Sequence, residues 1–355
     1  MTSKWITEYS KLADFISKHP EIKISPEIIR IPGNVKDQFY SQFDTVRKAL
    51  VHHTVDRDFS DTNHLIKQYN KAADKVVQNL GLTEITGEKA LLRFLADMNN
   101  WMERELFDPL FNALKGIITV SQLEKTAGAI VTTTIPEMHK KAYGNWIALS
   151  LINLLDADEI YGFNLPDLQP RDRVAVAPKG SYNPIVPPEK IGKIEFRYIH
   201  FELFTVPDFV IHSRKLNKYV SVRTHYENSV AQAANISQDR EWFNMKVVSD
   251  LTSGMMLIYI DDELFNLALI SDRDKFCRPD MIIEYRATEG WFDIEGFGVA
   301  DMHNQSLKPV KGSWVVSSAE IPEADALQTP ENIKVIDSVK EEGDLNPVVE
   351  HLVTV

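Results

Sequence analysis

The residue types best suited to chemistry are concentrated between positions 200 and 225. The candidates for ligand binding are His200, Glu202, His212, Arg214, Arg223 and His225. Imidazole and carboxylate groups bind zinc, iron and other transition metals, and arginine binds anions through its planar set of N–H donors. We therefore consider two kinds of site on a β-sheet face. One would hold an anionic small molecule, and the other a metal with the candidate ligands His200, Glu202, His212 and His225.

The direction of His200 and Glu202 depends on the strand that carries them. In residues 193–204 the apolar positions are even at the start and odd at the end, so the apolar face changes near Tyr198. A strand without a bulge would bury His200 and Glu202 beside Phe204, where an ionisable pair is costly and suggests function. A β-bulge, or a strand that passes between two environments, would leave both side chains exposed. The pattern leaves the two alternatives open.

The other candidates lie on the next two strands, which we predict to form a hairpin. A loop over residues 215–218 would pair Arg214 with Tyr219 and His212 with Ser221. The inward side chains are then Phe209, Ile211, Val220, Val222 and Tyr226. The outward side chains are His212, Arg214, Tyr219, Arg223, His225 and Glu227. This outward face is either an ordinary solvated sheet surface or the anion or metal site.

A second group of histidines and aspartates lies in residues 52–64. Their spacing fits neither a calcium loop nor a helical metal motif such as HExxH. We interpret the segment as a polar loop between two helices, in which Ser60 or Asp61 caps the second helix. The single cysteine, Cys277, has no base near it in the sequence, which favours a buried or unreactive thiol.

Two further motifs favour structural roles. The three acids at 261–263 separate two apolar runs at 255–260 and 264–270, which predicts a solvated turn between two strands. Gly296 and Gly298 lie in an apparent strand at 291–299, where glycine is typical of a bulge or of close packing.

The elements around these motifs change character along the chain. Residues 1–165 have helical periodicity, which predicts an N-terminal helical bundle; its widest apolar stripe runs from Leu91 to Leu106 and ends or kinks at Asp108-Pro109. A proline-rich connector follows at 166–190. Residues 191–318 alternate with a period of two, which predicts an antiparallel β-sandwich or a jelly-roll-like domain. The predicted fold class is therefore α+β.

The charge of the 355-residue chain is concentrated at its end. The formal net charge is -12, and residues 319–355 contribute nine acids and two bases. This composition predicts an extended acidic tail. A pI of about 5.4 disfavours nucleic acid or an anionic membrane as the main partner. One cysteine excludes an internal disulfide, and the N-terminus lacks a continuous apolar stretch, so we expect a cytoplasmic location.

Two functions fit these observations. The first is a soluble, non-catalytic binding or assembly protein with a protein partner or self-association, because we find no nucleophile, phosphate loop or metal motif. The alternative is an enzyme that depends on a metal or transforms a small molecule, with its site in the β-domain around His200, Glu202, His212 and His225. The sequence specifies neither a cofactor nor a substrate.

Overall fold

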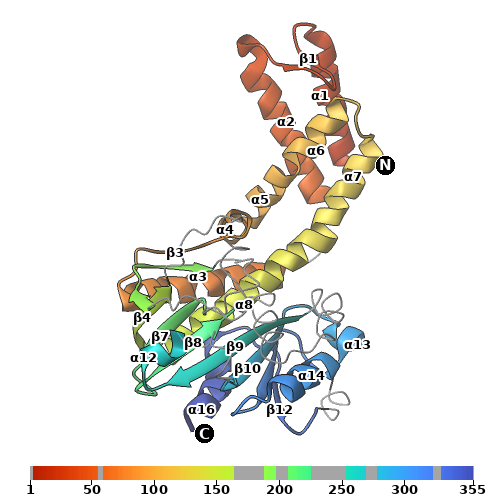
Figure 1. Ribbon diagram of the computed structural model, residues 1–355. Helices are drawn as coiled ribbons and strands as arrows, with labels where there is room; N and C mark the ends of the chain where they lie inside the picture. The colour runs from red at the N-terminus through yellow and green to blue at the C-terminus, as the bar shows by residue number, and fades with distance from the viewer. Residues whose placement is uncertain are drawn as a thin grey trace, which may run out of the picture. The chain divides into compact units, whose positions relative to one another are not determined.

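The computed structural model describes residues 3–54, 59–163, 188–196, 207–224, 253–268, 278–322 and 329–354 (Figure 1). The chain divides into two compact units. The helical unit comprises Met1–Asn63 and Lys89–Met138, and the sheet unit comprises His64–Glu88 and His139–Val355. Helices dominate the first unit and a large sheet the second, which confirms the predicted α+β class.

Aromatic packing holds the helical unit together. Its helices are α1 (Lys4–Lys18), α2 (Gly33–Thr54), α4 (Lys89–Ala96), α5 (Met98–Glu105), α6 (Phe107–Leu114), α7 (Val120–Ala129) and the π-helical turn η1 (Ile130–Thr134). Phe43 of α2 stacks against Phe107 and Phe111 of α6, with ring centroids 5.3 and 4.5 Å apart. Phe39 and Phe43 are fully buried. Apolar side chains of α1 and α2 thus form much of the core of this unit.

The apolar stripe at 91–106 spans more than one helix. Asp97 interrupts it, because its extended backbone and its side chain cap the start of α5 by accepting a hydrogen bond from the Asn100 N–H. A further break follows at Leu106, and Pro109 lies inside the first turn of α6, where proline is tolerated. The predicted end at Asp108-Pro109 was therefore wrong by a few residues.

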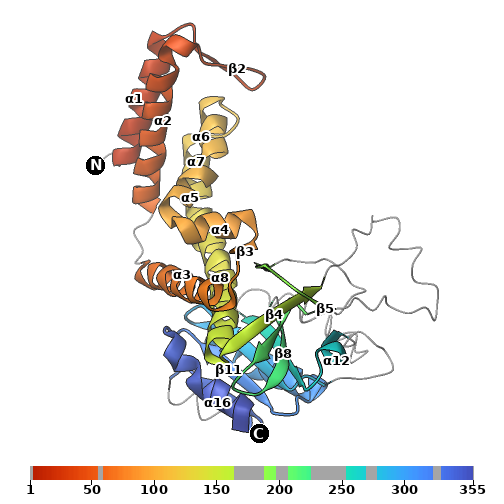
Figure 2. The ribbon, with the colours of Figure 1, turned by 90° about the vertical axis from the view of Figure 1, so that its left-hand side faces the viewer.

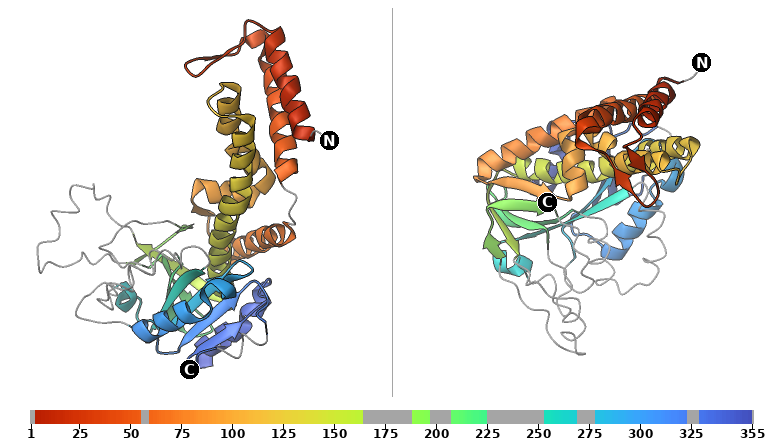
Figure 3. Two further views of the ribbon diagram at one scale, coloured as in Figure 1. Left: turned by 90° about the vertical axis from the view of Figure 1, so that its right-hand side faces the viewer. Right: turned by 90° about the horizontal axis from the view of Figure 1, so that it is seen from above.

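A short hairpin connects α1 to α2. Its strands are β1 (Lys23–Ile24) and β2 (Ile29–Arg30), which pair antiparallel and form a separate two-stranded sheet. Figure 2 shows this hairpin projecting from the end of the α1–α2 pair, beside the turn between α6 and α7, and Figure 3 shows the same neighbourhood from the opposite side. We call these two segments, residues 20–32 and 115–119, the hairpin end.

An eight-stranded mixed sheet forms the centre of the sheet unit. Its order is β12-β11-β10-β9-β8-β7-β4-β5. The bounds are β4 (Ala157–Phe163), β5 (Pro188–Lys190), β7 (Phe209–Ser213), β8 (Lys218–Arg223), β9 (Ser253–Asp261), β10 (Met281–Arg286), β11 (Ser313–Ser317) and β12 (Ile333–Ile336). The strands from β5 to β10 pair antiparallel, but β10, β11 and β12 are parallel. The prediction of an antiparallel sheet was therefore wrong at this edge.

Helices cover the sheet on both faces, as the view from above shows (Figure 3). On one face lie α8 (Ile135–Leu154), α3 (Ser60–Leu80) and the C-terminal α16 (Asn346–Thr354). On the other face lie α12 (Leu264–Ala268), α13 (Trp291–Glu295) and α14 (Gly298–Leu307). The second face buries two apolar clusters, one around Met255, Leu257 and Tyr259 and one around Trp291 and Val315. A second small sheet pairs β3 (Glu84–Gly87) with β6 (Lys193–Phe196) in parallel.

Tyr285 joins α8 to the sheet. Its ring lies against Gly144 of α8 and Gly254 of β9, and a methyl group on either glycine would overlap the ring. The Tyr285 hydroxyl donates a hydrogen bond to the Thr224 carbonyl at the end of β8. Two glycines therefore create the space that lets helix and sheet approach.

Two predicted strands are helices. Residues 264–268 form α12 instead of the second arm of a hairpin. Of the three acids predicted to form the turn, Asp261 is the last residue of β9, and only Asp262 and Glu263 form a bend. Residues 291–299 form α13 and the start of α14. Gly290 and Gly296 both have positive φ, 72° and 54°, so the glycines bound a short helix where we predicted a bulged strand.

The described part of the C-terminal segment is packed. Strand β12 pairs with β11, and after the turn η3 (Glu342–Leu345) helix α16 buries Val348, Val349 and Leu352. Trp314 of β11 donates a hydrogen bond from its indole N–H to Nδ1 of His351 at 2.8 Å. The prediction of an extended tail was therefore wrong for residues 329–354.

The predicted connector at 166–190 lies largely outside the described residues. Strand β4 precedes it and pairs with β7, which follows it, so the large sheet takes strands from both sides of that segment. Helix α2 ends at Thr54 and α3 begins at Ser60, so the segment 52–64, predicted to be a loop, lies partly within both helices.

Candidate functional site

The structure describes three of the six predicted ligand-binding residues. His212 lies on β7, Arg214 in the turn after it, and Arg223 at the end of β8. His200, Glu202 and His225 lie outside the described residues, as does Cys277. The three described residues do not form one cluster, because each has a different environment.

The hairpin β7–β8 keeps the predicted division of side chains between two faces but has a different register. The face predicted to be outward is largely covered, because Val210 and Ser221 on it are buried. His212 pairs with Tyr219 and Ile211 with Val220, which shifts the pairing by two residues from the predicted one. The turn closes over residues 214–217 because Asn217 adopts a left-handed conformation with φ 51°. A shift of two keeps every side chain on its predicted face but moves Arg214 from the strand into the turn.

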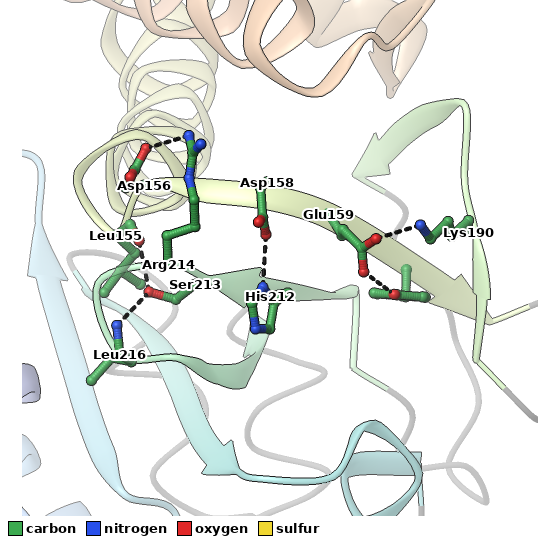
Figure 4. Close-up of polar contacts among 10 residues, drawn as sticks. Leu155, Asp156, Asp158, Glu159, Lys190, His212, Ser213, Arg214 and Leu216 are labelled. Atoms are coloured by element: carbon green, nitrogen blue, oxygen red, sulfur yellow. Dashed lines mark hydrogen bonds and ion pairs between the residues drawn. The ribbon is translucent and has the colours of Figure 1, made fainter.

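A strip of charged side chains follows β4 where it pairs with β7 and β5 (Figure 4). Nδ1 of His212 lies 2.7 Å from an Asp158 oxygen, and the Arg214 guanidinium lies 2.8 Å from Asp156. Glu159 accepts hydrogen bonds from Lys190 and from the Tyr161 hydroxyl. We call this set, which comprises Asp156, Asp158, Glu159, Tyr161, Lys190, His212 and Arg214, the polar strip.

A β-bulge in β4 determines where the acids of the polar strip lie relative to β7. The pairing of β4 with β7 shifts between Ala157 and Glu159, so Asp158 occupies the extra position and Glu159 lies opposite His212. The hydrogen bond from Lys190 is the main cause that lowers the pKa of Glu159. Burial raises the pKa of Tyr161, and its bond to Glu159 adds to the shift.

Each base of the polar strip faces an acid. His212 and Arg214 each face an aspartate, and Lys190 faces a glutamate. From the sequence, residues 1–165 were predicted to be helical, so the acids of the polar strip were not among the predicted site residues. Two of the residues predicted to bind an anion, His212 and Arg214, therefore already contact an acid.

Arg223 differs from its predicted position. We placed it on an outward face beside His212, but it is only 5% exposed. Burial lowers the pKa of its guanidinium, and the nearby Asp208 carboxylate opposes that shift. Asp208 also accepts hydrogen bonds from both the N–H and the hydroxyl of Thr224. This end of the hairpin is thus packed under other elements of the sheet unit.

A buried charged cluster escaped the sequence interpretation. Glu284 and Arg286 of β10 point to the face covered by α14, and Glu284 hydrogen-bonds Nδ1 of His303 on that helix. The Arg286 guanidinium lies 3.1 Å from Glu284 and stacks on Trp291 at 5.2 Å. Burial raises the pKa of Glu284, but His303 and Arg286 outweigh it, so the pKa is lowered. The sequence did contain a sign of this cluster, because Glu284 and Arg286 are charged residues within the otherwise apolar run 281–286.

The remaining histidines are dispersed. His53 lies 3.0 Å from Glu124 in the helical unit, whereas His64 lies 3.2 Å from Glu341 in the sheet unit. Within the described ranges, no group of three or more His, Cys, Asp or Glu side chains is arranged to hold a metal ion. In the same ranges no helix has the length and apolarity to span a membrane.

The helical unit exposes apolar side chains at its hairpin end. Among its described residues, the exposed large hydrophobic side chains are Ile28, Ile29 and Ile117, which are 55, 46 and 52% exposed. Ile28 and Ile29 lie on or beside β2, and Ile117 lies in the turn between α6 and α7 (Figure 2). All three thus lie in the two segments of the hairpin end.

Comparison with known proteins gives no relative: no family model, curated protein or solved structure matches this chain.

Proposed function

We propose that this chain is a non-catalytic binding or assembly protein whose contact surface is the hairpin end of the helical unit. The observation that carries the proposal is the position of Ile28, Ile29 and Ile117, which are the exposed large apolar side chains of that unit's described residues. Apolar side chains that gather at one place on a surface are typical of contact sites, whereas single scattered ones are ordinary. A protein partner would remove them from water. We place this activity in the cytoplasm, since a chain with one cysteine suits a reducing compartment.

The charged groups of the sheet unit support the same proposal. Each base of the polar strip already faces an acid, and the Glu284 cluster is fully buried. Charges that are buried or already paired are less available to an outside ligand than free ones. At the hairpin end, by contrast, the exposed groups are apolar. The sheet unit also exposes large apolar side chains, and these are Phe265, Ile294, Val310 and Val353.

Site-specific photo-crosslinking tests the proposal. A photoreactive amino acid replaces Ile29 in one variant and the exposed Lys48 of α2 in the control. We expect the Ile29 variant to form discrete crosslinked species in cells, either with another protein or with a second copy, and the Lys48 variant to form at least about tenfold less. Equal yields from both positions, with a monomeric protein in sedimentation experiments, would refute a contact surface at the hairpin end.

A metal-dependent enzyme is the second candidate, and one observation favours it. His212 uses Nδ1 to contact Asp158, which leaves Nε2 as the nitrogen that could bind a metal. A carboxylate that fixes the second ring nitrogen is the usual support of a metal-binding histidine. His212 is also partly exposed, with 23% of its side chain accessible. His200, Glu202 and His225 remain predicted ligands.

Elemental analysis separates the two candidates. The enzyme requires near-stoichiometric zinc, iron, manganese or copper in the purified protein, and His212→Ala should abolish it. His53→Ala is a matched control, because His53 also faces a partly exposed acid. Metal that persists in His212→Ala, or is lost equally in His53→Ala, would remove His212 from the proposed site.

A further inference from the structure

Two positive charges face each other across the hairpin of the helical unit. The register pairs Lys23 directly with Arg30, and both side chains are exposed. Within the described part of the chain, neither has an acidic side chain within ion-pair distance. Like charges at opposed positions destabilise a strand pair, and a two-stranded sheet is only marginally stable. The hairpin therefore presents a positive pair that its own unit leaves uncompensated.

The backbone of the same hairpin has an open edge. Ser25 N–H donates to the Ile28 carbonyl at 2.8 Å, which marks residues 25 and 28 as a hydrogen-bonded pair. Because such pairs alternate along antiparallel strands, the N–H and C=O of Ile29 point away from β1. Strand β2 has β1 as its one neighbour in this sheet. An extended chain could add here as a third strand.

The two faces of such a third strand would meet different side chains. Side chains alternate along a strand, so Ile28 and Arg30 share the face of Lys23, while Ile29 shares the face of Ile24. A partner strand would need acids on the first face and apolar residues on the second.

We propose that the open edge of β2 binds an acidic extended segment of a partner protein, in which acidic and apolar residues alternate. This inference rests on the proposed binding function and specifies the chemistry of the partner. Charge complementarity distinguishes it from pairing with a second copy, which would bring Lys23 and Arg30 of one chain toward those of another.

Selection of random displayed peptides against the full chain tests the proposal without a known partner. We expect the selected peptides to contain Asp or Glu at alternating positions. A selected acidic peptide should bind the double variant Lys23→Glu/Arg30→Glu roughly tenfold more weakly. Selection against that variant should enrich Lys and Arg instead. A circular dichroism spectrum and a thermal midpoint equal to those of the unchanged protein control for loss of structure, and the charge-matched control variant should not enrich Lys and Arg.

The matched control is Lys48→Glu/Lys125→Glu, which makes the same change in net charge at exposed positions of α2 and α7. It should bind the acidic peptide as tightly as the unchanged protein. Equal loss in the control, or selected peptides without an acidic bias, would overturn the inference. Hairpin-dependent dimerisation, or hairpin-dependent binding to phosphatidylserine vesicles, in the absence of acidic-peptide binding would also overturn it. Crosslinking at Ile29 together with non-acidic peptides would refute only the partner chemistry, whereas absence of crosslinking would refute the binding function.

Discussion

The strands of the two units use charged side chains in opposite ways. In the polar strip each base faces an acid on a neighbouring strand or turn, as His212 faces Asp158. In the hairpin β1–β2, Lys23 faces Arg30. Opposite charges on paired strands stabilise the sheet that carries them. Like charges on paired strands repel each other, and only a bound group of opposite charge would relieve this repulsion. The residue opposite a charged side chain therefore indicates whether that side chain stabilises the fold or is available to bind a ligand. The residue type of the charged side chain indicates this less well.

The largest expected effect comes from removing the acid-rich C-terminal segment, which was predicted to be an extended tail but is packed against the sheet. Truncation after Ser318 removes β12 and α16, including the buried Val348, Val349 and Leu352. Burial of each such side chain contributes about 1.5–3 kcal/mol, so we expect the truncated chain to lose its cooperative thermal transition. An unchanged transition midpoint would instead show that the acidic segment contributes nothing to the folded core.

A second test compares a buried acid with an exposed one. Glu284→Gln leaves Arg286 and His303 without their counter-charge, and breaking a buried ion pair costs about 3–5 kcal/mol. Glu27→Gln, in the exposed hairpin turn, should change the free energy of unfolding by less than about 0.5 kcal/mol. Urea denaturation measures both. Because the pKa of Glu284 is lowered in the folded state, its contribution should disappear as the pH falls below about 4.

A third test uses a histidine that faces cations. Burial, with Lys334 and Lys311, lowers the pKa of His351, whose Nδ1 must be unprotonated to accept the Trp314 N–H. The folded state therefore binds this proton more weakly than the unfolded state, and stability should decrease as the pH falls through about 6.5. His351→Asn keeps an acceptor but cannot titrate, so the melting temperature should lose this part of its pH dependence. The same loss in His53→Asn, on the helical unit, would contradict the assignment.

The smallest effects should have opposite signs in the two regions. Lys23→Glu places an acid opposite Arg30 and should stabilise the hairpin by about 0.2–1 kcal/mol. Asp158→Asn removes the partner of His212 and should destabilise the polar strip by a similar amount. Amide hydrogen exchange at Ser25, whose N–H donates to the Ile28 carbonyl across the hairpin, and at Val210 measures each locally. Effects of the same sign would remove the distinction between the two regions.

The sequence supports part of the fold well. Helical periodicity identified the N-terminal helical region, and period-two alternation identified which side chains of β7 and β8 share a face. The register failed, because Asn217 closes the turn one residue earlier than predicted. The short helices α13 and α14 were mistaken for a strand, since Trp291, Ile294 and Val299 favour strands and only the glycines indicated a break.

The candidate site was harder to predict than the fold. The sequence located His212 and Arg214, but their acidic partners come from residues 156–158, which looked like the end of a helix. Ion pairing across strands depends on pairings between distant parts of the chain, which periodicity does not encode. The hairpin end escaped notice for a similar reason. Exposed isoleucines look like core residues until the structure shows which of them remain in solvent.

The fit of Tyr285 between Gly144 and Gly254 has a consequence for ancestry. These three positions lie on α8, β9 and β10, and a side chain at either glycine would displace the ring. In any descendant of the same ancestor, they should change together or not at all. Two glycines and a tyrosine, separated by 110 and 31 residues, therefore form a signature by which remote kin could be recognised after most of the sequence has diverged.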